Sequence, residues 1–278
     1  MNIDAHQHFW RYDRARDTWI TSEMRVLQRD YLPEHLRPEL KAAGIDATVA
    51  VQADQSEHET RFLLALAESN PEVAGVVGWV DLRAENAGER LEYFSQFEKL
   101  RGFRHIAQSE PDDRFLMRED FLRGIAKLEQ HGFTYDILIY PRQLPATAEL
   151  VARFPRQRFV IDHAAKPSIK TGEMEPWATY MRRIGAHENV CCKLSGLITE
   201  ANWRSRKPAD FAPYLDVVFE VFGTRRLMFG SDWPVCLLAG TYAQVKQLIA
   251  DYAASDHARI FGDNAARFYG LTAFAVGP

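Results

Sequence analysis

The feature of this sequence that most constrains its fold is an alternation of short apolar segments with longer amphipathic segments, repeated eight times along the chain. The short segments are rich in β-branched and aromatic residues, as strands are, and the longer ones space their apolar residues as a helix does. A helix after each strand predicts parallel pairing. The expected strands are residues 3–6, 47–53, 73–82, 100–107, 134–140, 158–165, 190–195 and 226–231. The expected helices are residues 33–43, 56–69, 84–99, 118–131, 142–154, 175–187, 209–222 and 241–253.

Chain length selects among parallel folds. Eight strand and helix units in 278 residues match the size of a (β/α)8 barrel, the TIM barrel fold. A doubly wound open sheet is the alternative, but such a sheet usually has a glycine-rich turn after its first strand. At that position this chain has His-Gln-His-Phe-Trp. The sequence therefore favours the barrel.

Two segments are additions to a minimal barrel. Residues 9–30 form a long loop after the first strand, rich in Trp, Arg and Asp, and loops of this length tend to be functional. This loop is placed where it could cover the mouth of the barrel. Residues 255–271 predict an additional C-terminal helix. Because no internal repeat or Pro/Gly/Ser-rich linker interrupts the chain, residues 1–278 are expected to form one distorted barrel domain.

The charge distribution argues against two classes of partner. The formal net charge is −4, and Lys and Arg are interspersed with acidic residues, so neither nucleic acid nor a membrane surface is expected to bind. No segment approaches the roughly 18 apolar residues of a membrane span, and the N-terminus lacks the basic start and apolar core of a signal peptide. A cytoplasmic protein with a small-molecule substrate is expected, and its oligomeric state is left open.

The first strand ends in a His-x-His pair. Side chains alternate between the two faces of a strand, so His6 and His8 lie on one side and Gln7 on the other. Two imidazoles on one face suit a metal ion, or a carbonyl oxygen that needs hydrogen bonds. Such a pair also arises by chance, so partners from other strands have to support it.

The ends of the other expected strands carry those partners. In a barrel the C-terminal strand ends surround the active site, where polar groups face a pocket rather than a sealed core. The candidate residues there are His6, His8, Gln52, Trp79, Arg104, His105, His163, Lys166, Lys193, Asp232 and Trp233. Their convergence predicts one site. Asp232 could instead cap the next helix, and Arg104 and Lys193 could be structural partners of Asp162 or Asp81.

Three motifs resemble those of the amidohydrolase superfamily, in particular its amidohydrolase-2 branch. They are His6-Gln7-His8, the segment Phe-Val-Ile-Asp-His at 159–163 and the segment Phe-Gly-Ser-Asp-Trp-Pro at 229–234. The segments at 100–105 and 192–197 are similar to the sugar lactonase group of that branch. The resemblance covers nearly the whole chain. It implies a distorted barrel that hydrolyses a lactone ring, with His6, His8 and His163 holding a metal or the carbonyl and Asp232 activating water.

The chain also departs from the superfamily's two-metal pattern. Members with two metals have a carbamylated Lys at the fourth strand and a His at the fifth, where this chain has Arg104-His105 and Tyr140. The resemblance therefore implies one divalent ion, such as zinc, or none. If an ion binds, its ligands are expected to be His6, His8, His163 and Asp232. A metal-free enzyme, in which the imidazoles donate directly to the carbonyl, is the open alternative.

The expected chemistry is hydrolysis of a sugar lactone, an aldonolactone, by water that Asp232 deprotonates, in sugar catabolism. Donors and acceptors for a polyhydroxylated substrate are expected from Gln52, Trp79, Arg104, His105, Lys166, Lys193 and Trp233. Two other functions stay open: metal-dependent decarboxylation of an aromatic acid, as the same branch includes, and a catalytically silent barrel that binds a sugar acid.

Overall fold

The computed structural model describes residues 1–253 and 256–271 and contains a single sheet of eight parallel strands, paired in the order β1 to β8. The strands are β1 (Ile3–Gln7), β2 (Ala47–Val51), β3 (Val73–Gly78), β4 (Leu100–His105), β5 (Thr134–Ile137), β6 (Phe159–Ile161), β7 (Val190–Leu194) and β8 (Leu227–Phe229). Between the end of β1 and the segment after β8, the His8 amide donates to the Trp233 carbonyl at 2.7 Å and the Asp232 amide donates to the His6 carbonyl at 2.8 Å. These bonds join the two edges, which confirms the predicted barrel.

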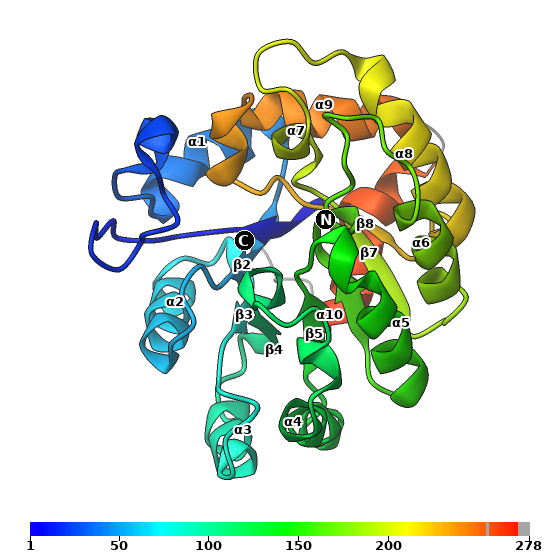
Figure 1. Cartoon of the computed structure of the whole chain (residues 1–278). Coiled ribbons are helices and arrows are strands. Elements are labelled where there is room, and N and C mark those ends of the chain that lie inside the picture. Colours follow the sequence, from blue (N-terminus) through cyan, green and yellow to red (C-terminus); the bar gives the residue numbers. More distant parts are fainter. Residues whose placement is uncertain (254–255, 272–278) are drawn as a thin grey trace.

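Helices surround the strands, which Figure 1 shows at the centre of the molecule. The α-helices are α1 (Pro33–Ala43), α2 (Glu57–Ser69), α3 (Ala87–Ser95), α4 (Glu119–Gln130), α5 (Leu144–Arg153), α6 (Trp177–Gly185), α7 (Leu197–Glu200), α8 (Pro208–Phe222), α9 (Tyr242–Tyr252) and α10 (Asn264–Tyr269). Local signals explain several boundaries. Ser56 and Thr241 cap α2 and α9 by accepting from the amides of Glu59 and Gln244, and Gly44 ends α1 with φ +62°.

The strands are buried on both faces, as parallel strands covered by helices should be. All residues of β2 and β3 are buried, and their sequences, Ala-Thr-Val-Ala-Val and Val-Ala-Gly-Val-Val-Gly, show no apolar and polar alternation. The predicted C-terminal helix is confirmed: a π-helical turn at Arg259–Asp263 leads into α10, while Ser255 lies outside the described residues. Phe268 and Tyr269 of α10 pack with apolar side chains of β1 and β2.

Several strands are shorter than predicted. The segment 158–165 was expected to be one strand, but β6 ends at Ile161, and the backbone from His163 to Lys166 has φ between +48° and +58°. Sequence periodicity gave no sign of this left-handed turn, because apolar residues such as Ala164 and Ala165 also fit a strand.

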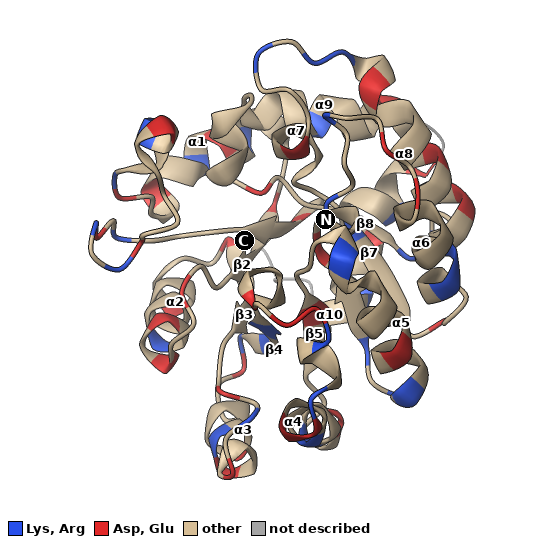
Figure 2. Ribbon diagram, viewed as in Figure 1, with Lys and Arg blue, Asp and Glu red and all other residues tan. Residues whose placement is uncertain are grey.

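The loop 9–30 contains a 3₁₀ turn at Ser22–Leu27 and is joined to the start of α1 by the antiparallel bridge between Trp10 and Tyr31. Figure 2 shows acidic and basic residues interspersed over outer helices such as α2, α3 and α4. In the described part of the chain, none of the helices combines the length and apolar character that crossing a membrane requires.

Candidate active site

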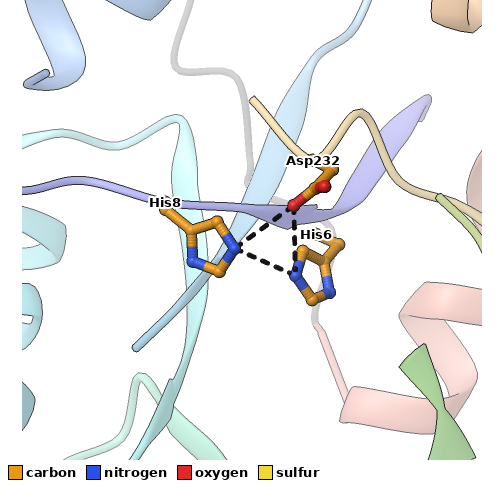
Figure 3. A group of neighbouring side chains, drawn as sticks. All are labelled: His6, His8 and Asp232. Carbon is orange, nitrogen blue, oxygen red and sulfur yellow. Dashed lines mark hydrogen bonds and ion pairs between the residues drawn. The ribbon is translucent and has the colours of Figure 1, made fainter. Parts of the chain in front are cut away.

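Three imidazoles and one carboxylate meet at the C-terminal end of the barrel. His6 lies in β1 and His8 directly follows it, and Figure 3 shows their rings facing the carboxylate of Asp232, which follows β8. The Nε2 atoms of His6 and His8 are 3.1 Å apart, and Asp232 Oδ1 lies 3.8 Å from the first and 3.4 Å from the second. His163 Nε2 lies 3.9 Å from the same oxygen. The predicted catalytic residues are therefore brought together around one point.

Hydrogen bonds fix the orientation of the imidazoles. His8 Nδ1 lies 2.7 Å from the Val51 carbonyl oxygen, which can only accept, so Nδ1 carries the proton and Nε2 offers its lone pair to the site. His163 Nδ1 pairs with Ser195 Oγ at 2.9 Å, which likewise leaves Nε2 directed at Asp232. The fixed rings present their Nε2 atoms without reorganisation.

Backbone conformation also positions two of these residues. His163 and Asp232 both have left-handed backbones, with φ +54° and +55°. A non-glycine residue in this region costs of the order of 1–3 kcal/mol, and such strain often marks a functional site. Gly196 makes room for the His163 ring, because a Cβ at position 196 would lie 2.5 Å from His163 Nδ1.

Burial and charge set the protonation of the site. Burial lowers the pKa of His163 to about 4, and it lowers the pKa of His6 well below its ordinary value. Burial alone would raise the pKa of Asp232, but the adjacent imidazoles His163, His6 and His8 outweigh it and hold that pKa well below the usual range. At neutral pH the site therefore presents a carboxylate beside neutral His6 and His163.

A network of buried charges lies next to His6. Lys193 Nζ donates to Asp136 Oδ2 at 2.5 Å and lies 3.0 Å from Asp162 Oδ1, and Arg104 Nη1 donates to Asp162 Oδ2 at 2.9 Å. Burial raises the pKa of Asp162, but Lys193, His6 and Arg104 lower it well below its ordinary value. His6 Nδ1 lies 3.1 Å from Lys193 Nζ and 3.3 Å from Asp162 Oδ1. The network thus positions the His6 ring through contacts with its Nδ1 atom, on the side away from Asp232.

A cavity of about 460 Å³ opens above the imidazoles. Of the residues predicted to form the site, those that line it are His8, Arg104, His163, Lys166 and Asp232. His6 is fully buried and contacts His8 at the floor. The volume is within the range of small-molecule sites.

Gln52 and Lys193 were predicted to contact substrate, but direct contact does not fit their positions. Both side chains are fully buried and neither lines the cavity. Gln52 donates to the Arg104 carbonyl and accepts from the Arg104 guanidinium, while Lys193 is enclosed by Asp136 and Asp162. The structural interpretation of Lys193, as a partner of Asp162, fits the contacts.

Direct contact also does not fit Trp79, His105 and Trp233, which do not line the cavity. His105 accepts from Trp79 Nε1 at 3.3 Å and its Nε2 lies 2.7 Å from Glu110 Oε1, so both ring nitrogens have protein partners. Trp233 packs edge to face against Tyr31, with the ring centroids 5.0 Å apart. These side chains support the walls of the site.

Several cavity residues were not predicted. Trp10, Trp19 and Met24 come from the loop 9–30, which therefore contributes a wall of the cavity. Glu200 and Trp203 come from α7 and the segment after it, which lie beyond the end of β7. The aromatic residues of the loop 9–30 were a signal that it could line the site. No comparable sequence signal pointed to Glu200.

The donor set fits one divalent ion. Neutral imidazole nitrogens and carboxylate oxygens are zinc ligands. The donor atoms of His6, His8 and Asp232 all lie within 4.8 Å of one another, close enough to share one ion. A second group, His6, Asp162 and His163, has similar spacing. There, however, the Asp162 oxygens already face Lys193 and Arg104, and these two cations oppose a second metal ion.

Comparisons with known proteins identify the family. The family model described as Amidohydrolase (Amidohydro_2) matches residues 3–271. An L-fucono-1,5-lactonase of Burkholderia multivorans is 43% identical over 98% of this chain and 96% of its own length, and one from Burkholderia ambifaria is 39% identical over 97% and 95%. A crystal structure of a zinc-bound amidohydrolase from Burkholderia multivorans, 43% identical, superposes with a TM-score of 0.93 and covers 98% of this chain and 100% of that one. The chain belongs to the amidohydrolase family.

Proposed function

We propose that this protein is a lactonase, a carboxylic ester hydrolase that opens the ring of a neutral sugar lactone. The observation that carries the proposal is the convergence of three Nε2 atoms and the Asp232 carboxylate at the floor of a cavity large enough for a sugar lactone. The two similar Burkholderia proteins named L-fucono-1,5-lactonase support the substrate class.

The chemistry assigned to Asp232 is general base and then general acid. A water oxygen attacks the carbonyl carbon while Asp232 takes one of its protons, and the electron pair of the carbonyl moves onto its oxygen. When the tetrahedral intermediate collapses, the bond from carbon to ring oxygen breaks, and Asp232 returns the proton to that oxygen. The product is the open hydroxy acid.

The developing oxyanion needs donors or positive charge held in place. The Arg104 guanidinium lines the cavity, and its Nη1 lies 3.4 Å from His6 Nε2, so it supplies positive charge at the floor. A bound divalent ion would polarise the carbonyl oxygen, and His6, His8, His163 and Asp232 would hold it. Ser231 and Cys236 are buried, and burial raises the pKa of the Cys236 thiol well above its ordinary value, so neither suits the role of nucleophile.

We expect the purified protein to bind at most one equivalent of zinc per chain, because Lys193 and Arg104 occupy the surroundings of Asp162. Elemental analysis after zinc loading and extensive dialysis measures this number. Two tightly held equivalents would contradict the single-ion geometry. Full activity after complete chelation would assign carbonyl activation to the imidazoles and Arg104 instead.

A substrate panel tests the proposed function. Acid release is measured with neutral aldonolactones of five-membered and six-membered rings, and carbon dioxide release is measured with hydroxybenzoic acids under the same conditions. We expect hydrolysis of at least one neutral aldonolactone and no decarboxylation. Carbon dioxide release without lactone hydrolysis would favour the decarboxylase hypothesis, and binding of sugar acids without turnover of any lactone would favour a silent barrel.

A further inference from the structure

Glu200 and Lys166 form a charged pair on one wall of the cavity, and the site chemistry described above does not use the carboxylate. Glu200 is the last residue of α7, and Lys166 ends the left-handed turn that begins at His163. The amide of Lys170 donates to the Glu200 carbonyl at 3.0 Å, which ties α7 to the segment after that turn. The pair is thereby held at a fixed place beside the catalytic groups.

Both side chains retain capacity to bind a ligand. Lys166 Nζ and Glu200 Oε1 are 3.6 Å apart, too far for a good hydrogen bond. In residues 1–253 and 256–271, neither charged group makes a shorter polar contact with another side chain, and the ammonium otherwise lies 5.2 Å from the centre of the Tyr140 ring. The two side chains are only 17% and 21% exposed, and both line the cavity. A donor and an acceptor are therefore presented side by side on a mostly buried part of the cavity wall.

The surroundings of this pair suit a sugar. Tyr140, beside the Lys166 ammonium, and Trp203 also line the cavity, and aromatic rings provide flat apolar surfaces against which the C–H face of a sugar ring can pack. Adjacent hydroxyls on such a ring offer one hydrogen to a carboxylate and one oxygen to an ammonium. At 3.6 Å apart, Lys166 Nζ and Glu200 Oε1 are close enough to bind two neighbouring hydroxyls of one ring.

The same arrangement is unfavourable for an anionic substrate. Glu200 and Asp232 both line the cavity. Burial raises the pKa of Glu200, and the negative charge of Asp232 adds to this shift while Lys166 opposes it. A substrate carboxylate placed against this wall would add a third negative group in a poorly solvated space. The two basic residues that line the cavity are already engaged, Lys166 with Glu200 and Arg104 with Asp162, so neither can fully compensate for the added charge.

We propose that Glu200 is a specificity-determining residue: together with Lys166 it binds two adjacent hydroxyls of a neutral lactone, and its charge excludes lactones that carry a carboxylate. This inference rests on the proposed lactonase function. It extends that function to a residue in α7 that acts on recognition and takes no part in proton transfer.

Two variants test the proposal on the full-length protein, Glu200→Gln and Glu200→Ala. The matched control is Glu57→Gln, because Glu57 is 25% exposed, is paired with Arg90 and Arg61 and lies outside the cavity. Three probes are compared: the best neutral aldonolactone, its analogues that each lack one hydroxyl, and an aldaric acid lactone that keeps a free carboxylate.

For Glu200→Gln we expect kcat/KM for the neutral lactone to fall about 10-fold, mainly through KM, because a charge-assisted hydrogen bond becomes a neutral one. For the carboxylate-bearing lactone we expect kcat/KM to rise by a similar factor. The wild-type enzyme should lose about 10- to 100-fold on at least one deoxy analogue, and Glu200→Ala should show no such loss, because the partner of that hydroxyl is gone. Glu57→Gln should behave as wild type with every probe.

The outcomes separate this proposal from the proposed function. If the wild-type protein hydrolyses no lactone, the lactonase assignment fails and the role of Glu200 fails with it. If the wild-type protein is active, but both Glu200 variants keep the wild-type ratio between neutral and anionic lactones and the wild-type sensitivity to each missing hydroxyl, the specificity role alone is overturned. A fall in kcat that is equal for all probes would also overturn it, because that pattern indicates a structural effect.

Discussion

Replacing Asp232 by Asn should lower kcat for lactone hydrolysis by about 100-fold or more while leaving the barrel folded. The amide is nearly isosteric with the carboxylate, but it cannot accept the proton of the attacking water, and a positioned base is worth about 100- to 10,000-fold. The backbone bonds at this position, from the Asp232 amide to the His6 carbonyl and from the Cys236 amide to the Asp232 carbonyl, do not involve the side chain. Steady-state kinetics combined with thermal unfolding measures both effects.

The control for this variant is Asp81→Asn. Asp81 also carries an ionised carboxylate, since its hydrogen bonds with Arg83 lower its pKa despite partial burial, but it lies outside the cavity. We expect its kinetics to stay within about twofold of wild type, because substitutions away from the site have small effects. Near-normal turnover by Asp232→Asn would remove Asp232 from the role of base and leave the imidazoles to activate water.

The fold was accessible from sequence because the barrel repeats one simple unit. Each of the eight strands gave a short apolar run and each following helix gave an amphipathic pattern, so an error at one boundary did not affect the others. Boundaries were wrong where the backbone departs from regular geometry. The turn at His163–Lys166 is the main example, since nothing in Asp-His-Ala-Ala-Lys indicates four successive residues with positive φ.

The candidate site was partly predictable for a related reason. Strand ends at the top of a barrel converge, so His6, His8, His163 and Asp232 could be grouped from their positions alone. The depth of a side chain below the cavity could not be predicted: Lys193 lies in β7, is fully buried and contacts His6 rather than the cavity. Nor could sequence show that α7 would bring Glu200 back to the cavity wall, because this depends on tertiary contacts such as that with Lys170.

The buried position of Lys193 leads to a second large effect, this time on stability. Lys193→Met should lower the free energy of unfolding by about 3–5 kcal/mol, because it leaves the buried carboxylates of Asp136 and Asp162 without their shared cation. Asp162 keeps Arg104 at 2.9 Å, whereas among the residues that the structure describes Asp136 keeps only the Tyr269 hydroxyl, at 2.7 Å. Chemical denaturation monitored by circular dichroism measures the loss.

The pH dependence of this loss of stability tests whether the Asp136 carboxylate causes it. Burial already raises the pKa of Asp136 to about 6, although Lys193 opposes the shift, so removing Lys193 should raise this pKa further. An acid whose pKa is higher in the folded state binds its proton more tightly there, so stability is lost as the pH rises from the unfolded value of about 4 through the folded value. We expect Lys193→Met to be destabilised more at pH 8 than at pH 5.

The double variant Lys193→Met/Asp136→Asn provides the decisive comparison. It removes the Asp136 carboxylate as well as the Lys193 cation. Replacing both members of a buried ion pair lowers stability far less than removing one of them. We therefore expect it to regain more than half of the lost stability at pH 8 and to show a flatter pH dependence than the single variant. If the double variant is as unstable as Lys193→Met at both pH values, lost packing of the lysine chain accounts for the effect. Activity of the refolded double variant then shows whether the position of His6, whose Nδ1 lies 3.1 Å from Lys193 Nζ, depends on the cation as well.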